Sequence, residues 1–443
     1  MIWTVAAREI LDNLMSLKFL FGTALCLALV VISTVVSLND YQKRMDEYDT
    51  AIANYKEEPN VFYNAQIYRK PEVLSIFVRG FEKRFGNVVN IDDKVPVQAG
   101  GFMGTLRSAE FSTEFASIDF LFVVKVILSL LAIFLSYDAI SGEYELGTLK
   151  LALSRPVSRA SIILGKLISG IVCLLIPLII SLIVGILIVQ LIGGVPFTSE
   201  DWLRTASIAG VAILCVMSFY MLGLVVSSRT HQAAVSLLIL LIIWLTGIFL
   251  IPEIAAAVVD RYRLTMPSPD KDIAALRKIP RNKMGRDPIP NWYKEPEAYA
   301  RWRMKWDELQ DEANNSVWKL QRQYLNRLYS QADLVRWICR ISPSESCAYA
   351  AEAMARTDVT AYKKFMRHVR SYHKQHREFI KSKYKDEDKF NAEQDTYSEP
   401  VLVEAVALST SFHAALPDIC LLIVFNVLFF MLSILFFIRY DVH

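Results

Sequence analysis

Residues 167–192 read LISGIVCLLIPLIISLIVGILIVQLI, a run without a single charged side chain. A helix of about 20 apolar residues is long enough to cross the roughly 30 Å hydrocarbon core of a bilayer. Because a backbone in lipid must satisfy its own hydrogen bonds, such a run is expected to be a helix. Five further runs of comparable length lie at residues 19–38, 119–137, 205–226, 233–251 and 419–438. The sequence therefore predicts an all-α polytopic membrane protein with six transmembrane helices.

The composition shows that the chain is divided between membrane and water. Of the 443 residues, 53% are hydrophobic and 21% are charged, too apolar for an ordinary soluble protein and too charged for a wholly embedded bundle. The 48 Lys and Arg residues nearly balance the 45 Asp and Glu residues, leaving a formal charge of +3. This balance excludes nucleic acid as the main partner and leaves membrane lipids as the expected surroundings of the spans.

The distribution of basic residues predicts the orientation. The segment between the second and third runs carries four basic residues, whereas residues 193–203, between the third and fourth runs, carry none. Short loops rich in Lys and Arg stay in the cytoplasm. We therefore expect a multi-pass protein of the inner (cytoplasmic) membrane with both termini in the cytoplasm. The two long insertions, residues 39–118 and 252–411, are then extracytoplasmic.

This orientation divides the chain into five parts. Residues 1–38 hold an amphipathic N-terminal helix, with Ala6, Ile10 and Leu14 on its apolar side, and the first span. We expect this helix to lie in the plane of the membrane surface. The other parts are the first extracytoplasmic domain at 39–118, spans two to five at 119–251 with the cytoplasmic segment 138–166, the second extracytoplasmic domain at 252–411, and the sixth span with the cytoplasmic C-terminus at 412–443.

The two insertions have different patterns. Residues 61–68 and 73–78 have the β-branched and aromatic content of short strands, which predicts a small α+β domain in the first insertion. In the second insertion, apolar residues recur at helical spacing over 296–341, whereas the Pro-rich residues 266–291 are expected to form a loop. Ser342, Pro343 and Glu345 match a capping box that starts another helix, so we predict a long antiparallel helical hairpin standing away from the membrane.

Few residues have the pattern of a catalytic or metal site. The chain has no P-loop, GxSxG, HExxH or CxxC motif, and His373 and His376 are surrounded by Arg and Lys residues that oppose cation binding. We expect no catalytic residues, metal or cofactor in this chain. Cys339 and Cys347 flank the Ser-Pro turn, and their spacing is compatible with a disulfide there as well as with two free thiols.

The spans hold almost none of the ionisable groups that an ion-coupled carrier needs at mid-membrane. Lys125 is the exception, about two helical turns into the second span. We expect its side chain to reach the membrane surface; lining a vestibule or binding an anionic lipid or substrate group is the alternative. If the protein transports a cargo, the energy is therefore expected to enter from the cytoplasmic side.

The cytoplasmic segment 138–166 has a distinctive pattern of its own. Leu146, Leu149 and Leu153 form one side of a short predicted helix, with Glu143 and Glu145 in its first turn. A helix of this kind can insert into a groove of a partner, and an ordinary turn at the membrane surface has the same pattern.

The run EYELGTL at 143–149, RPVSR at 155–159 and GK at 165–166 resembles the cytoplasmic loop of type-2 ABC exporter permeases, particularly the multicopper-enzyme-maturation branch. The resemblance implies a coupling helix that docks on a separate cytoplasmic ABC ATPase subunit, which binds ATP and Mg, and a second permease subunit, identical or paralogous. We expect Glu143 and Glu145 to make polar contacts with the ATPase and Leu146 and Leu149 to be hydrophobic anchors. Arg155 and Arg159 would contact lipid phosphate or the partner, and Gly147, Thr148 and Pro156 complete the motif.

The leading hypothesis is the permease subunit of an ABC exporter of a lipid-like or hydrophobic peptide substrate, without an ATPase site of its own. The size of the two insertions favours an alternative, in which ATPase motion is relayed to an extracytoplasmic partner without any cargo. A membrane-anchored scaffold without an ATPase is the third hypothesis. The presence of a nucleotide-binding subunit in pull-downs separates this scaffold from the other two.

Overall fold

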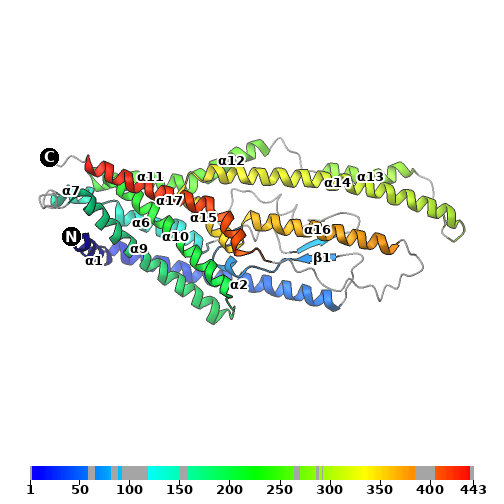
Figure 1. Cartoon of the computed structure of the whole chain (residues 1–443), viewed down its shortest axis with the longest axis horizontal. Coiled ribbons are helices and arrows are strands. Elements are labelled where there is room, and N and C mark those ends of the chain that lie inside the picture. Colours follow the sequence, from blue (N-terminus) through cyan, green and yellow to red (C-terminus); the bar gives the residue numbers. More distant parts are fainter. Residues whose placement is uncertain are drawn as a thin grey trace.

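The computed structural model describes residues 2–57, 65–80, 88–91, 118–149, 158–263, 270–285, 289–291, 293–384 and 405–439. The protein is elongated, with a helical bundle from which several helices project at one end (Figure 1). The N-terminal helix α1 (Ile2–Leu14) and the C-terminal end of α17 (Leu408–Ile438) lie at the opposite end of the bundle. We call these the insertion end and the terminal end.

Six helices of the described chain are long and apolar enough to cross a membrane, which confirms the predicted number. The first is part of α2 (Leu17–Glu57), which continues far beyond the bundle, and the fourth is α10 (Ser199–Ser227). The sixth is α17. The other three contain π-helical segments: α5 (Phe120–Phe122), η3 (Val123–Leu128) and α6 (Ser129–Ser136) form the second span, α9 (Arg159–Leu187) and η4 (Ile188–Ile192) the third, and α11 (Ala233–Leu245), η5 (Thr246–Leu250) and α12 (Ile251–Arg263) the fifth.

Small residues allow the spans to approach closely, as in other membrane helix pairs. A Cβ atom placed on Gly223 of α10 would lie 1.8 Å from the Ser136 Oγ of α6, and one on Gly170 of α9 would lie 2.0 Å from the Tyr220 ring. In contrast, nothing lies within 4 Å of such an atom on Gly210, also in α10. The crossing of α6 and α10 therefore requires glycine at position 223.

A Gly223→Val substitution is expected to lower the free energy of unfolding by about 1–3 kcal/mol, because the two helices must separate to make room. Thermal unfolding of the purified protein in detergent measures the change. Gly210→Val, in the same helix with open space around it, is the matched control and is expected to leave the melting temperature nearly unchanged. Equal melting temperatures for the two variants would contradict the packing argument.

The first insertion contains one two-stranded antiparallel ribbon among the described residues, β1 (Ala65–Tyr68) with β2 (Val88–Ile91). The prediction of a strand at 73–78 is wrong, because Val73–Ile76 form a 3-10 helix, η1. Consecutive residues of η1 are buried instead of alternate ones, and Phe77 packs edge-on against Phe120 of the second span. The described residues do not support a separate α+β domain.

The second insertion is helical, as expected, but it contains an additional helix. The predicted loop at 266–291 is wrong over α13 (Asp270–Met284), which packs through Ile273 on Val317. The long helix α14 (Pro296–Cys339) agrees with the prediction. The helix after it is divided into α15 (Pro343–Ala355) and α16 (Val359–Tyr384) at Arg356, whose φ of 62° is left-handed.

The position of α15 differs most from the predicted hairpin. Instead of standing away from the membrane, α15 packs between α10 and α17 inside the insertion end of the bundle, and Cys347 lies in the same buried core as Cys215 of α10. The chain thus enters the bundle at the end of α14, turns and leaves along α15 (Figure 1). The predicted capping box is absent, since Ser342 makes no side-chain cap and the carboxylate of Glu345 binds Lys125.

Candidate functional site

A buried lysine joins three elements at the terminal end. Lys166 of α9 is 2% exposed, and its Nζ lies 2.5 Å from a carboxylate oxygen of Glu9 in α1 and 2.7 Å from one of Glu143 in α7 (Ser141–Glu145). The backbone carbonyl of Lys166 also accepts a hydrogen bond from the Tyr220 hydroxyl of α10 at 2.8 Å. A buried cation that binds two carboxylates holds their elements together. We call Glu9, Glu143 and Lys166 the lysine junction.

Further polar contacts tie α1 and α2 to the bundle beside the lysine junction. Asn13 of α1 donates to Ser169 of α9 at 3.3 Å. Lys18, in the first turn of α2, lies 2.6 Å from Asp138 and donates to the Tyr137 hydroxyl at 2.9 Å. These contacts fix α1 along α9, and a displacement of α1 would therefore also displace the third span.

The helix predicted around Leu146 and Leu149 is broken after one turn. Gly147 has a φ of 71°, a left-handed conformation that ends α7. Leu146 at this turn is 79% exposed, whereas Leu149 is fully buried against Ile163 and Phe437. The two leucines therefore do not share a face, and the prediction that Leu149 anchors a partner is corrected. Of these two leucines, only Leu146 is exposed, and Leu153, the third leucine of the predicted face, lies outside the described residues.

Three other residues of the motif make hydrogen bonds within the chain. A carboxylate oxygen of Glu145 accepts from the backbone N–H of Ala233 at 3.2 Å, at the start of α11, and the Thr148 hydroxyl donates to the Glu143 carbonyl at 3.2 Å. Arg159 donates to the last carbonyls of α17, those of Phe437 and Ile438, at 2.7 and 2.8 Å, and its contact with lipid phosphate or a partner stays a prediction. Arg155 and Pro156 lie outside the described residues.

Two ion pairs hold α15 and its entry turn in the bundle at the insertion end. Lys125 of the second span lies 2.6 Å from the carboxylate of Glu345 in α15. The side chain is therefore paired within the protein, which corrects the expectation that it reaches the membrane surface; the alternative, a contact with an anionic lipid or substrate group, stays a prediction. Arg340, at the end of α14, binds both carboxylate oxygens of Asp418 in α17, at 2.6 and 3.0 Å. Asp418 is completely buried.

Cys339 and Cys347 are both buried free thiols in the structure, which corrects the suggested disulfide. Cys339 belongs to a cluster with Ala255 and Tyr349, whereas Cys347 belongs to the main core of the bundle with Cys215. The two thiols therefore lie in different clusters of buried side chains. Among the described residues, no group of His, Cys, Asp and Glu side chains is arranged to hold a metal ion.

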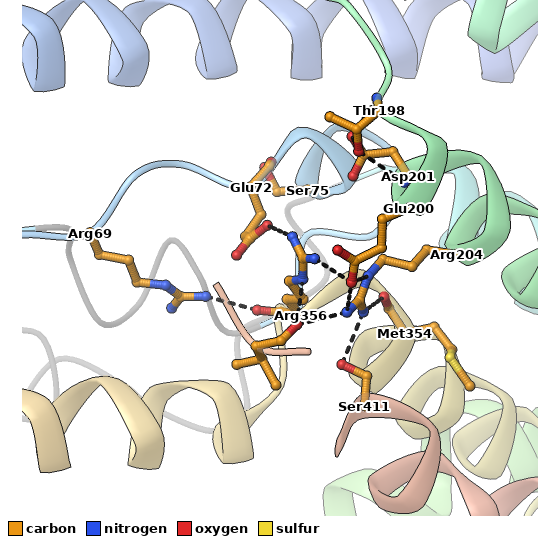
Figure 2. Close-up of polar contacts among 11 residues, drawn as sticks. Arg69, Glu72, Ser75, Thr198, Glu200, Asp201, Arg204, Met354, Arg356 and Ser411 are labelled. Atoms are coloured by element: carbon orange, nitrogen blue, oxygen red, sulfur yellow. Dashed lines mark hydrogen bonds and ion pairs between the residues drawn. The ribbon is translucent and has the colours of Figure 1, made fainter. Parts of the chain in front are cut away.

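A second polar cluster joins both insertions to the fourth and sixth spans (Figure 2). Arg204 of α10 is fully buried and donates to the Glu200 carboxylate at 2.7 Å, to the Met354 carbonyl at 2.8 Å and to the Ser411 hydroxyl at 2.9 Å. Arg356 lies 2.7 Å from the same Glu200 oxygen and 3.1 Å from Glu72 of the first insertion. We call Glu72, Glu200, Arg204 and Arg356 the arginine cluster.

The contacts with Glu72 and Glu200 stabilise the charged form of Arg356. Burial lowers the pKa of its guanidinium, but the carboxylates of Glu72 and Glu200 outweigh burial and leave the pKa above its usual value. Arg356 therefore stays charged and links the two insertions.

Sequence patterns did not indicate the lysine junction or the arginine cluster. Lys166 lies 157 positions from Glu9, and Arg204 lies 207 positions from Ser411. Contacts over such separations follow from helix packing, which no local motif encodes. One signal was available in the sequence. Arg204 and Asp418 directly precede apolar runs, and charged residues next to membrane spans usually have a partner of opposite charge, so the two positions could have been marked as paired.

The comparisons with known proteins give a match over most of the chain. The model of a family described as "ABC-2 family transporter protein" matches residues 3–342 of the 443. A second model, described as "Domain of unknown function (DUF3526)", matches residues 288–397, which include α14, α15 and α16. No curated protein matches the chain.

Proposed function

Because the chain belongs to the ABC-2 family of transporter proteins, we propose that this multi-pass membrane permease is driven by a cytoplasmic ABC ATPase that docks at its terminal end. Membership in the family implies such an ATPase partner. The proposed docking surface consists of the turn at Leu146, beside the lysine junction, and the adjacent helix α1. In this arrangement the termini are cytoplasmic, and the insertions are extracytoplasmic.

The observation that carries the proposal is the combination of an exposed apolar tip and a buried ionic link behind it. Leu146 is 79% exposed at the turn after α7, while Glu143, three residues earlier, is bonded to Lys166 of the third span. A partner that grips Leu146 would therefore move α7, and Lys166 would transmit the displacement to α9 and, through Glu9, to α1. Rigid helices joined by such contacts move as levers.

Several finer assignments belong to the same proposal. We place the protein in the inner membrane, in the multicopper-enzyme-maturation branch of type-2 exporters because of the motif at 143–159, and in a dimer with a second permease subunit. ATP and Mg would be bound by the partner ATPase. The apolar spans favour export of a lipid-like or hydrophobic peptide cargo.

A second candidate function is mechanical relay to an extracytoplasmic partner without transport. The arginine cluster favours it, because Arg356 and Arg204 connect both insertions directly to the fourth and sixth spans. Movement of the spans would then move the projecting helices. Reconstituted vesicles separate the two candidates: an exporter moves cargo across the membrane when ATP is added, whereas a relay changes only the positions of α14 and α16.

The docking surface is tested by Leu146→Asp. Burial of a leucine side chain at an interface contributes about 1.5–3 kcal/mol, and about 1.4 kcal/mol corresponds to a tenfold change in affinity. We therefore expect the amount of ATPase that co-purifies with the variant to fall at least about tenfold. Ile289→Asp, at an exposed isoleucine of the second insertion, is the matched control and is expected to retain the ATPase. Undiminished co-purification with Leu146→Asp would contradict the proposed surface.

A further inference from the structure

A pocket of about 300 Å³ opens beside the arginine cluster at the insertion end. Its walls come from the segment that follows β1, from the start of α10, from α16 and from the residues before α17. The first insertion, the second insertion and a membrane span thus meet around one cavity. A concave site with apolar walls and a few converging charges is the usual form of a ligand site.

The acidic residues that line this pocket all have partners within the protein, whereas most of the basic residues pair with no carboxylate in the described part of the chain. Of its seven charged residues, four are basic and three are acidic. Glu72 and Glu200 bind Arg356, and the carboxylate of Asp201 accepts from the backbone N–H of Thr198 at 2.9 Å and from its hydroxyl at 2.7 Å. The three carboxylates are therefore engaged within the protein.

Three of the four cations remain available. Among the described residues, no carboxylate pairs with Arg69, Lys70 or Lys364. Arg69 is 8% exposed and uses one N–H for the Arg356 carbonyl at 2.8 Å, and Figure 2 shows its guanidinium directed toward that residue. A guanidinium and two ammonium groups that line one pocket without a carboxylate paired to them among the described residues favour a bound anion, and phosphate and carboxylate groups match their geometry.

Apart from Thr198, the uncharged residues of the pocket are apolar. Val73, Phe365 and Val406 line it together with Pro71 and two alanines, and Phe365 and Val406 are buried. A cavity with cations on one part of its wall and aliphatic and aromatic groups on the other suits an amphiphile better than a small inorganic ion.

We propose that this pocket binds the anionic head group of an amphiphilic ligand, a phosphate above all, on the side of the membrane where the insertions lie. The inference goes beyond ATPase docking and does not depend on it, because the elements that line the pocket lie at the opposite end of the bundle from α7 (Figure 1). The phosphate can belong to a lipid or to a free phosphate compound, and the experiment separates these sources.

Calorimetric titration of the full chain in a nonionic detergent tests the proposal with three probes: dihexanoyl phosphatidic acid, inorganic phosphate and zwitterionic dihexanoyl phosphatidylcholine. We expect the phosphatidic acid to bind, and to bind at least about tenfold more weakly to Lys70→Gln/Lys364→Gln, because about 1.4 kcal/mol of lost charge pairing corresponds to that factor. Neither lysine has an ion-pair partner among the described residues, so the double variant is expected to fold.

Lys283→Gln is the control, since Lys283 pairs with Glu312 on the distant α13 and α14 and its loss is expected to leave binding unchanged. Binding of the phosphatidic acid alone would assign a lipid, and equal binding of inorganic phosphate would assign a free phosphate group; both support the anion site. The proposal is overturned if neither anion binds, if phosphatidylcholine binds as well as phosphatidic acid, or if the double variant binds like the wild type. Co-purification of the ATPase should be unchanged in the double variant, which keeps this test separate from that of Leu146.

Discussion

Replacement of Lys166 by methionine is expected to uncouple the permease from its ATPase while leaving the two proteins associated. The methionine keeps the apolar part of the side chain but removes the cation that binds Glu9 and Glu143 at 2.5 and 2.7 Å. Two carboxylates then face each other across a site whose charge is no longer balanced. Removing one partner of a buried ion pair costs about 3–5 kcal/mol, and the two glutamates keep 25% and 29% exposure, so the lower end of that range applies.

The readout is the ATPase activity of the assembled complex divided by that of the isolated ATPase. We expect the Lys166→Met complex to approach a ratio of one, because α7 is no longer bonded to α9. Glu9→Gln leaves the bond between Lys166 and Glu143 in place and is expected to have a smaller effect. Lys18→Met, at a pair that is 41% exposed on the lysine side, is the matched control for losing a lysine at this end of the bundle. A wild-type ratio for Lys166→Met would show that the lysine junction does not transmit the motion.

The contrast between Leu146 and Lys166 shows what the sequence could reveal. The six spans were predictable because length and hydropathy are local properties that decide whether a helix can cross a bilayer. Leu146 belonged to a local motif and could be named from it as a candidate contact for a partner, which stays a prediction. Lys166 belonged to the same motif, in the GK pair at 165–166, but no role was predicted for it, because its partner Glu9 becomes a neighbour only after α1 has packed on α9.

At the insertion end, too, local patterns predicted a helix but not the contacts that it makes. The helix α14 follows from the spacing of its apolar residues, but the entry of α15 into the bundle does not. Glu345 fits the pattern of a capping box equally well whether its carboxylate turns back to the chain or reaches Lys125, which lies 220 positions away. The ion pair with Lys125 lowers the free energy more than a helix cap would, because Lys125 would otherwise be a charge without a partner in an apolar bundle.

Removal of the Asp418 carboxylate is expected to have the largest effect on stability. Asp418 is fully buried in α17 and binds Arg340 through both oxygens, with Arg336 3.8 Å away. In Asp418→Ala the guanidinium of Arg340 loses its counter-charge at the place where α14 enters the bundle. We expect the free energy of unfolding to fall by about 3–5 kcal/mol, the usual cost of leaving one charge of a buried pair alone. Thermal unfolding in detergent measures it.

A double variant distinguishes the loss of charge balance from a simple loss of packing. Arg340→Met/Asp418→Leu replaces the ion pair by apolar side chains of similar length, and such replacements are often neutral. We expect it to recover most of the stability that Asp418→Ala loses. Asp333→Ala, which breaks a half-exposed pair with Lys363, is the matched control and should cost at most about 1 kcal/mol. If the double variant were as unstable as Asp418→Ala, the entry turn of α15 would depend on the shape of the ion pair and not on its charge.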